Sequence, residues 1–441
     1  MSESKKYIDI SSSKRAVHFA DLYTYKGKIS KIMGLTVEAV GIVCNIGDIC
    51  KIETEDNGVI LAEVVGLKNG SVQLMPYGEV DGIGSESIVY NTARKLTVGV
   101  GRGLMGRTID ALGRPIDGGP PIERTKLYPI NGVPSNPMTR PPISDTIQLG
   151  VKAIDGLLTI GKGQRMGIFA GSGVGKSTLM GMIARNVKAD INVIALVGER
   201  GREVVEFIDR DLGPEGMART VLVIATSDQP AMMRSKCALT ATAIAEYFRD
   251  EGMDVLLMMD SLTRFCMAQR EIGLSAGEPP VARGYTPSIY TALPKLLERS
   301  GKFEKGSITG IYTVLVEGDD TNEPIADTVR GIVDGHIVLS RKEAMRNHYP
   351  AIDVLASISR LMSTIADDRH KKAAGKMRRM LSCYKENQDL ISIGAYKAGS
   401  NPELDEAIRH ISAIDEFLQQ DVSDKFDFED TINEMVEIVN R

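Results

Sequence analysis

Short apolar runs broken by Gly and Asn fill the chain from Tyr25 to Lys95. Within these runs apolar positions often alternate with polar ones, which is the pattern of a half-buried strand. The Asn-Gly pairs at 57–58 and 69–70 are typical of tight turns between antiparallel strands. Roughly six such strands in about 70 residues predict a small β-barrel over residues 24–96.

Longer apolar runs begin near residue 166 and alternate with segments that predict helices. Each run is almost continuously apolar, as expected for a strand that is buried on both faces. This alternation predicts an α/β domain with a mostly parallel sheet covered by helices on both faces. The predicted strands lie at 166–169, 191–197, 220–226, 255–260 and 308–316, and the predicted helices at 179–187, 202–211, 230–250 and 288–300.

The remaining stretches lack these patterns. Residues 1–23 are polar with scattered apolar positions and predict a tail. Residues 99–145 are rich in Gly, Pro and Arg and predict ordered connectors rather than helices. We therefore expect four parts, which are the tail (1–23), the barrel (24–96), the α/β domain (97–365) and a C-terminal helical domain (366–441).

Composition narrows the class of protein. The 441 residues are 43% hydrophobic and carry a net charge of −5, which indicates a folded, mildly acidic chain and disfavours a nucleic-acid partner. The five cysteines contain no CxxC pair, so we expect reduced packing residues in a reducing compartment. The polar N-terminus has no apolar signal core, and no apolar run approaches the roughly 20 residues of a membrane span. We therefore expect a cytoplasmic protein that meets a membrane only through partners.

A glycine-rich loop lies between the first predicted strand and helix of the α/β domain. The strict phosphate-loop pattern begins with Gly, and here that place is taken by Ala170, but the rest of the pattern is met. Backbone N–H groups in such a loop surround phosphate oxygens, and the lysine reaches the β- and γ-phosphates. A turn that binds nothing is the disfavoured alternative. The predicted nucleotide-binding residues are Gly171, Ser172, Gly173, Val174, Gly175, Lys176, Ser177 and Thr178.

Two carboxylates lie at the carboxyl ends of apolar runs. Asp260 ends the run at 255–260, where it could hold Mg²⁺ together with the Ser177 hydroxyl, or could instead cap the helix that starts at Ser261. Glu199 ends the run that follows the loop's helix, and it is placed to polarise an attacking water. Arg200 could hold Glu199 or steady developing charge. A surface ion pair at the strand end is an equally good interpretation of Glu199 and Arg200.

The sequence alone leaves the roles of two further residues open. Arg360, in the segment Ser357-Ile-Ser-Arg360, is either a surface arginine or one that stabilises the transition state of a neighbouring subunit. Tyr349, followed by Pro350, is either a packing residue or a platform for adenine.

Several long strings resemble the rotary-type ATPases, the family that includes the catalytic subunit of ATP synthase. The resemblance covers roughly residues 25–420 and is closest to the type III export ATPases, above all the flagellar export ATPase. The strings begin at Asp110 (DALGRPIDG), Ala170 (AGSGVGKST), Leu196 (LVGERGREV), Asp260 (DSLTRF), Ala268 (AQREIGL), Gly277 (GEPP), Arg283 (RGYTPS), His348 (HYPAIDVL) and Ser357 (SISR).

The resemblance implies a RecA-like P-loop core between an N-terminal β-barrel and a C-terminal helical domain. It also implies a role for individual residues. Glu199 resembles the water-activating glutamate, Arg200 and Arg264 its arginine partners near the phosphates, and Tyr349 the aromatic residue that stacks on adenine. Arg360 resembles the arginine finger that acts on the neighbouring subunit's nucleotide. Mg²⁺ and ATP are the implied cofactor and substrate.

The implied function is ATP hydrolysis by a homohexamer that energises type III protein export at the base of a flagellum. The implied partners are a dimeric regulator at the N-terminal tail, a central coiled-coil stalk protein, the export gate and chaperone–substrate complexes. The wording Phe265-Cys-Met-Ala-Gln-Arg-Glu resembles the flagellar form more than the injectisome form. A synthase catalytic subunit is a further alternative. A non-catalytic subunit is disfavoured by Glu199, and a ring RNA translocase by the acidic charge and the aromatic-poor barrel.

Overall fold

The computed structural model describes residues 26–56, 58–68, 70–132, 136–316 and 323–441. The chain divides into two compact units at the Leu96–Thr97 junction, and each unit is described by itself. The predicted tail at 1–23 lies outside the described residues.

The first unit contains a closed antiparallel barrel with strand order β1-β2-β5-β4-β3-β6. Its core is a compact set of aliphatic side chains, among them Val37, Ile52, Leu74 and Val89, which are fully buried. The barrel predicted from short alternating runs is therefore confirmed. Its strands are β1 (Lys26–Met33), β2 (Thr36–Val40), β3 (Asp48–Glu53), β4 (Val59–Lys68), β5 (Ser71–Pro76) and β6 (Ile88–Lys95).

The second unit is built on a sheet with the order β19-β18-β12-β17-β15-β13-β14-β8, and β16 pairs with β17. All neighbours from β18 to β8 are parallel, so the carboxyl ends of these strands lie along one edge. The strands are β8 (Thr108–Asp110), β12 (Arg165–Ala170), β13 (Ile191–Glu199), β14 (Thr220–Thr226), β15 (Asp254–Asp260), β16 (Gly301–Lys302), β17 (Ser307–Leu315), β18 (Gly335–Leu339) and β19 (Ile358–Ser359). Two small sheets pair β7 (Thr97–Val100) with β9 (Lys126–Pro129) and β10 (Thr146–Ile147) with β11 (Ile160–Gly161).

Helices cover both faces of this sheet, as the apolar strands predicted. On one face Ile168 and Leu196 share a core with α3 and with C-terminal helices. On the other face α6 packs on β13, β14 and β15. The helices of this part are α2 (Lys152–Leu157), α3 (Lys176–Asn186), α4 (Gly201–Glu206), α5 (Gly213–Ala218), α6 (Ala231–Asp250), α7 (Leu262–Ser275), α8 (Pro287–Leu297), α9 (Pro324–Ile332), α10 (Arg341–Met345) and α11 (Met362–Ile365).

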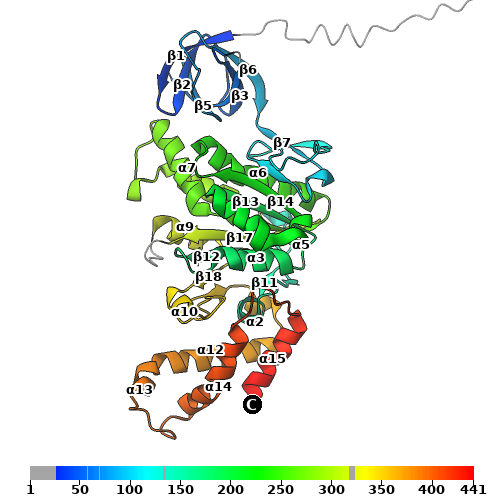
Figure 1. Cartoon of the computed structure of the whole chain (residues 1–441), viewed down its shortest axis with the longest axis vertical. Helices are drawn as coiled ribbons and strands as arrows, with labels where there is room; N and C mark the ends of the chain where they lie inside the picture. The colour runs from blue at the N-terminus through cyan, green and yellow to red at the C-terminus, as the bar shows by residue number, and fades with distance from the viewer. Residues whose placement is uncertain (1–25, 57, 69, 133–135, 317–322) are drawn as a thin grey trace, which may run out of the picture. The chain divides into compact units, whose positions relative to one another are not determined.

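The C-terminal segment is helical, as predicted from residue 366 onward. Figure 1 shows α12, α14 and α15 gathered next to α2. The contact with α2 is close, because a side chain at Gly156 would lie 2.5 Å from the Met435 sulfur, and the His370 ring lies 2.6 Å from the Gly156 carbonyl. These helices are α12 (Asp368–Glu386), α13 (Gln388–Ser392), α14 (Pro402–Leu418) and α15 (Phe428–Asn440).

The structure refines several details of the sequence prediction. The helix predicted at 202–211 is α4 followed by a turn of π-helix over Phe207–Leu212, and strand β8 lies in the stretch predicted as connectors. All five cysteines are free, and all except Cys383 are buried, as packing residues are. None of the helices in the described part of the chain has the length and apolar character of a membrane span.

Candidate active site

The glycine-rich loop follows β12 directly and leads into α3. Gly173 and Gly175 have φ values of 78° and 87°, the left-handed region where a residue with a side chain is strained. Gly175 is the N-cap of α3, so Lys176 and Ser177 lie in its first turn. The first turn of a helix leaves backbone N–H groups without partners in the helix, which favours bound anions. The local conformation is that of a phosphate-binding loop.

The Lys176 ammonium group lies between two carboxylates from neighbouring strands. Its Nζ is 2.5 Å from Asp260 Oδ1 and 3.6 Å from Glu199 Oε1. Thr313 of β17 also donates a hydrogen bond to Asp260 Oδ1, at 2.7 Å. Burial alone would lower the pKa of Lys176, but Asp260 and Glu199 raise it above its ordinary value. Lys176 therefore carries its charge where phosphates would bind.

Glu199 is the second carboxylate of this cluster. Its side chain is 12% exposed. Burial and the nearby Asp260 carboxylate raise the pKa of Glu199 to about 7, while Lys176 lowers it and a hydrogen bond with Glu203 raises it further. A carboxylate with a pKa near the working pH is suited to exchange a proton with water.

The first turn of α7 adds an arginine to the same edge. Ser261 caps this helix by accepting a hydrogen bond from the Arg264 backbone N–H at 3.2 Å, so the alternative that Asp260 caps it is wrong. Gly198 has a positive φ of 70°, and a side chain there would lie 3.2 Å from the Arg264 Cβ. Arg264 therefore lies across the end of β13, next to Glu199. Its Nε is buried and has no hydrogen-bond partner among the described residues.

A cavity of about 440 Å³ opens beside the loop. Its lining combines the loop, α3 and two distant segments, namely Gly175, Thr178, Leu179, Met182, Leu339, Asn347, Tyr349, Pro350, Ala351 and 419–422. A side chain at Gly175 would lie 3.5 Å from the Tyr349 ring, which is 41% exposed. A larger cavity of about 880 Å³, near Arg140 and Phe303, includes none of the predicted site residues. The smaller cavity is therefore the one that adjoins the glycine-rich loop and Tyr349.

Two predicted residues lie apart from this cluster. The Arg200 side chain is 76% exposed and contacts Glu203 at 3.5 Å rather than Glu199. Arg360 is exposed, and its guanidinium lies 3.4 Å from the Arg330 carbonyl. Within one chain both arginines have surface positions.

Three contributors were missed by the sequence analysis. Thr313 and Glu203 act on the carboxylates described above, and Gln420 donates its backbone N–H to the Tyr349 carbonyl at 3.0 Å. No local pattern marks Thr313, because β17 is buried almost throughout, and none marks Gln420, because it reaches the site from the C-terminal segment.

The loop, the paired lysine and the two strand-end carboxylates define a P-loop nucleotide-binding protein. The chain belongs to the ATP synthase alpha/beta family. Residues 150–359 match the nucleotide-binding domain of this family and residues 29–93 its beta-barrel domain. Residues 366–437 match the T3SS EscN ATPase C-terminal domain. The predicted fold class is confirmed.

Known relatives and solved structures match this chain over nearly its whole length. The flagellum-specific ATP synthase of Bacillus subtilis is 56% identical over 94% of this chain and 95% of its own length. The type 3 secretion system ATPase of Xanthomonas euvesicatoria is 50% identical over 94% of each.

The assembled ATPase EscN of enteropathogenic E. coli has a TM-score of 0.90 at 46% identity and covers 94% of this chain and 100% of its own. The same ATPase in complex with its central stalk EscO has a TM-score of 0.88 at 45% identity, with the same coverage. The chain is an ATP hydrolase of the flagellar and type III secretion branch of this family.

Proposed function

We propose that this ATPase energises type III protein export for flagellar assembly, as a homohexamer with active sites at subunit interfaces. The observation that carries the catalytic part is the cluster in which Lys176 lies between Asp260 and Glu199 at the end of the phosphate loop. The flagellar part is supported by the identity of 56% to a flagellum-specific relative.

In this proposal each residue of the cluster has one task. When nucleotide binds, the Lys176 ammonium group leaves Asp260 and contacts the β- and γ-phosphates. Glu199 polarises the attacking water, for which a pKa of about 7 is suitable. Arg264 supplies positive charge near the phosphates, which would give its buried Nε a partner. Arg200 becomes a second arginine partner if its side chain leaves Glu203.

We infer that Mg²⁺ is held by the Ser177 hydroxyl and the Asp260 carboxylate. Oxygen donors of this kind fit Mg²⁺, and Asp260 is buried at 4% exposure. No cluster of three or more metal-binding side chains occurs among the described residues, so phosphate and water oxygens would complete the coordination. The ion would neutralise charge on the transferred phosphoryl group.

The two remaining residues act on nucleotide from outside the cluster. Tyr349 stacks on adenine in the cavity beside Gly175. Arg360 stabilises the transition state in the neighbouring subunit, which accounts for its exposed position in a single chain. The assembled state of EscN, 46% identical to this chain, supports a ring.

The proposed partners follow the proposed parts of the chain. A central stalk protein is supported by the structure of EscN with its stalk EscO. We further propose that a dimeric regulator docks on the tail at 1–23, that the barrel spans 24–96 and that the ATPase domain spans 97–365. The helical domain at 366–441 would face the export gate and chaperone–substrate complexes. The protein would work in the cytoplasm, peripheral to the base of the export apparatus.

An injectisome ATPase is the second candidate, because a type 3 secretion relative is 50% identical. Expression of this chain in two strains, one that lacks its flagellar export ATPase and one that lacks its injectisome ATPase, distinguishes the two. We expect flagellar protein export to return, and a Lys176→Ala variant expressed at the same level should fail. Restoration of injectisome secretion but not of flagellar export would overturn the flagellar assignment.

A rotary synthase catalytic subunit is the other alternative. Separately, nucleotide turnover tests the proposed catalytic role of Glu199. Glu199→Gln should bind ATP as the wild type does but lose turnover. An active Glu199→Gln enzyme would refute the assignment of the general base.

A further inference from the structure

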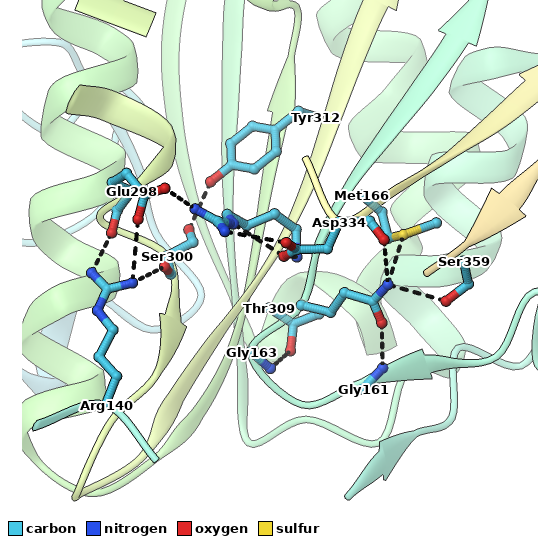
Figure 2. A network of polar contacts seen from close by, with 12 residues as sticks. Arg140, Gly161, Gly163, Met166, Glu298, Ser300, Thr309, Tyr312, Asp334 and Ser359 are labelled. Atoms are coloured by element: carbon cyan, nitrogen blue, oxygen red, sulfur yellow. Dashed lines mark hydrogen bonds and ion pairs between the residues drawn. The ribbon is translucent and has the colours of Figure 1, made fainter. Parts of the chain in front are cut away.

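A buried glutamine directly precedes β12, at the opposite end of this strand from the phosphate loop. Gln164 has no exposed surface. Its side-chain oxygen accepts a hydrogen bond from the Gly161 N–H at 2.8 Å, and its amide nitrogen donates to the Asp334 carbonyl and the Ser359 hydroxyl, both at 3.1 Å. Figure 2 labels its partners Gly161, Asp334 and Ser359, which lie close together. A buried amide with both ends bonded orients its partners, since each lost bond leaves a polar group unpaired.

The Asp334 carbonyl is the link from this amide to Arg360. It accepts a hydrogen bond from the Arg360 backbone N–H at 3.0 Å as well as the one from Gln164. The position of Asp334 is itself held by Arg165, whose Nε and Nη2 donate to the two carboxylate oxygens at 3.1 and 3.2 Å. The Asp334 N–H in turn donates to the Arg165 carbonyl at 2.8 Å. The acceptor that receives the Arg360 N–H is therefore fixed to β12.

The residue before Arg360 is held by the segment that leads into β12. The Ser359 hydroxyl donates to the Thr159 carbonyl at 2.7 Å and accepts from Gln164. Strand β19 also lies directly against β18, because a side chain at Gly335 would come within 2.5 Å of the Ile358 carbonyl. Ser359 and Arg360, at the end of β19, are therefore held by residues at the starts of β12 and β18.

We propose that Gln164 is a positioning residue for Arg360, so that its hydrogen bonds set where the arginine enters the neighbouring subunit's active site. This inference rests on the proposed role of Arg360 in trans. The same contacts connect Arg360 to β12, which ends at Ala170 and leads into the phosphate loop of the same subunit. The arginine proposed to act on the neighbouring subunit's nucleotide is therefore anchored to the strand that precedes its own subunit's loop.

The test replaces the amide with an apolar side chain of similar length, Gln164→Met. Nucleotide affinity should stay unchanged, because the loop and the Tyr349 cavity are not altered. Turnover should fall on the order of 10²-fold, the loss that a displacement of about 1 Å in a reacting group produces. The double variant Gln164→Met/Arg360→Ala should be no slower than Arg360→Ala alone, because the two changes remove one function.

Mixed rings separate positioning from a general structural role. Lys176→Ala subunits lack a working site of their own but supply an intact Arg360. They should raise the activity of Gln164→Met well above that of either variant alone. Arg360→Ala subunits should give no such rescue, because neither subunit then supplies a well-placed arginine.

Asn192→Leu is the matched control, since Asn192 is equally buried and its amide donates to the Ala184 carbonyl at 2.8 Å, away from Arg360. The ATPase activity of Asn192→Leu should not be raised more by Lys176→Ala subunits than by Arg360→Ala subunits. If Gln164→Met fails to fold, Ser359→Ala, which loses the hydrogen bonds with Gln164 and Thr159 but keeps those of Gln164 to Gly161 and Asp334, should show the same pattern with a smaller loss.

Two failures of rescue in the mixed rings have different meanings. If Arg360→Ala is rescued by Lys176→Ala but Gln164→Met is not, the positioning role is refuted. If Arg360→Ala itself is not rescued, the role of Arg360 in trans fails first.

Discussion

Replacing Glu199 by Gln should remove turnover and at the same time stabilise the nucleotide-free protein at alkaline pH. The folded protein raises the pKa of Glu199 from 4.5 to about 7, chiefly by burial and by the Asp260 carboxylate. A raised carboxyl pKa means that the folded state disfavours the charged form, so this residue's contribution to stability is lost as pH rises from 4.5 through 7. The difference of 2.5 pH units corresponds to about 3 kcal/mol. Gln resembles the protonated acid and does not suffer this loss.

Thermal unfolding at two pH values measures the effect. At about pH 5 the melting temperatures of Glu199→Gln and wild type should agree, and at about pH 8.5 the variant should melt several degrees higher. Turnover should fall by about 10²–10⁴-fold, while ATP affinity is retained. Glu206→Gln is the control, because Glu206 is a partly exposed residue of α4 paired with Arg202. A Glu199→Gln variant that melts below the wild type at alkaline pH would refute the electrostatic reasoning.

Three further predictions concern the same site. Lys176→Ala should weaken nucleotide binding and cost about 3 kcal/mol of stability in the nucleotide-free protein, because it leaves the buried Asp260 without its cation. Adding Asp260→Asn should restore the melting temperature but not the binding, and unchanged affinity in Lys176→Ala would mean that the loop is misassigned. Tyr349→Ala should weaken ATP binding by about 10- to 100-fold, the value of stacking on one base, whereas Tyr349→Phe should bind normally in the same titration. Ser261→Ala should lower the free energy of unfolding by about 1 kcal/mol through loss of the α7 cap, and Ser261→Thr should retain it in urea unfolding.

Local patterns were sufficient for the parts of the site that come from continuous stretches of chain. The loop needs its glycines and lysine at fixed spacing, so Gly173 to Ser177 could be identified without a structure. Glu199 and Asp260 could be paired because the carboxyl ends of parallel strands share one edge of the sheet. The barrel and the helical C-terminal segment likewise followed from period and composition.

Contacts between distant segments could not be predicted in this way. Gln420 reaches Tyr349 only because α14 packs near α2, and nothing near residue 420 indicates that contact. Strand β18, with only five residues and half-buried positions at His336 and Val338, lacks the long apolar run that marked the other strands. The cap of α7 was also missed, because only Asp260 was considered for it. Asp260 is held by Lys176 and Thr313, and Ser261 caps the helix.

The central claim is an ATPase whose active site is completed by the neighbouring subunit. The most direct measurement is specific ATPase activity against protein concentration for wild type and Arg360→Ala, with the size of the particle determined at each dilution. The account predicts that wild-type activity per subunit rises as rings form, and that Arg360→Ala forms the same rings but hydrolyses slowly throughout. A monomer with full specific activity, unaffected by Arg360→Ala, would contradict the shared site and leave Arg360 as a surface arginine.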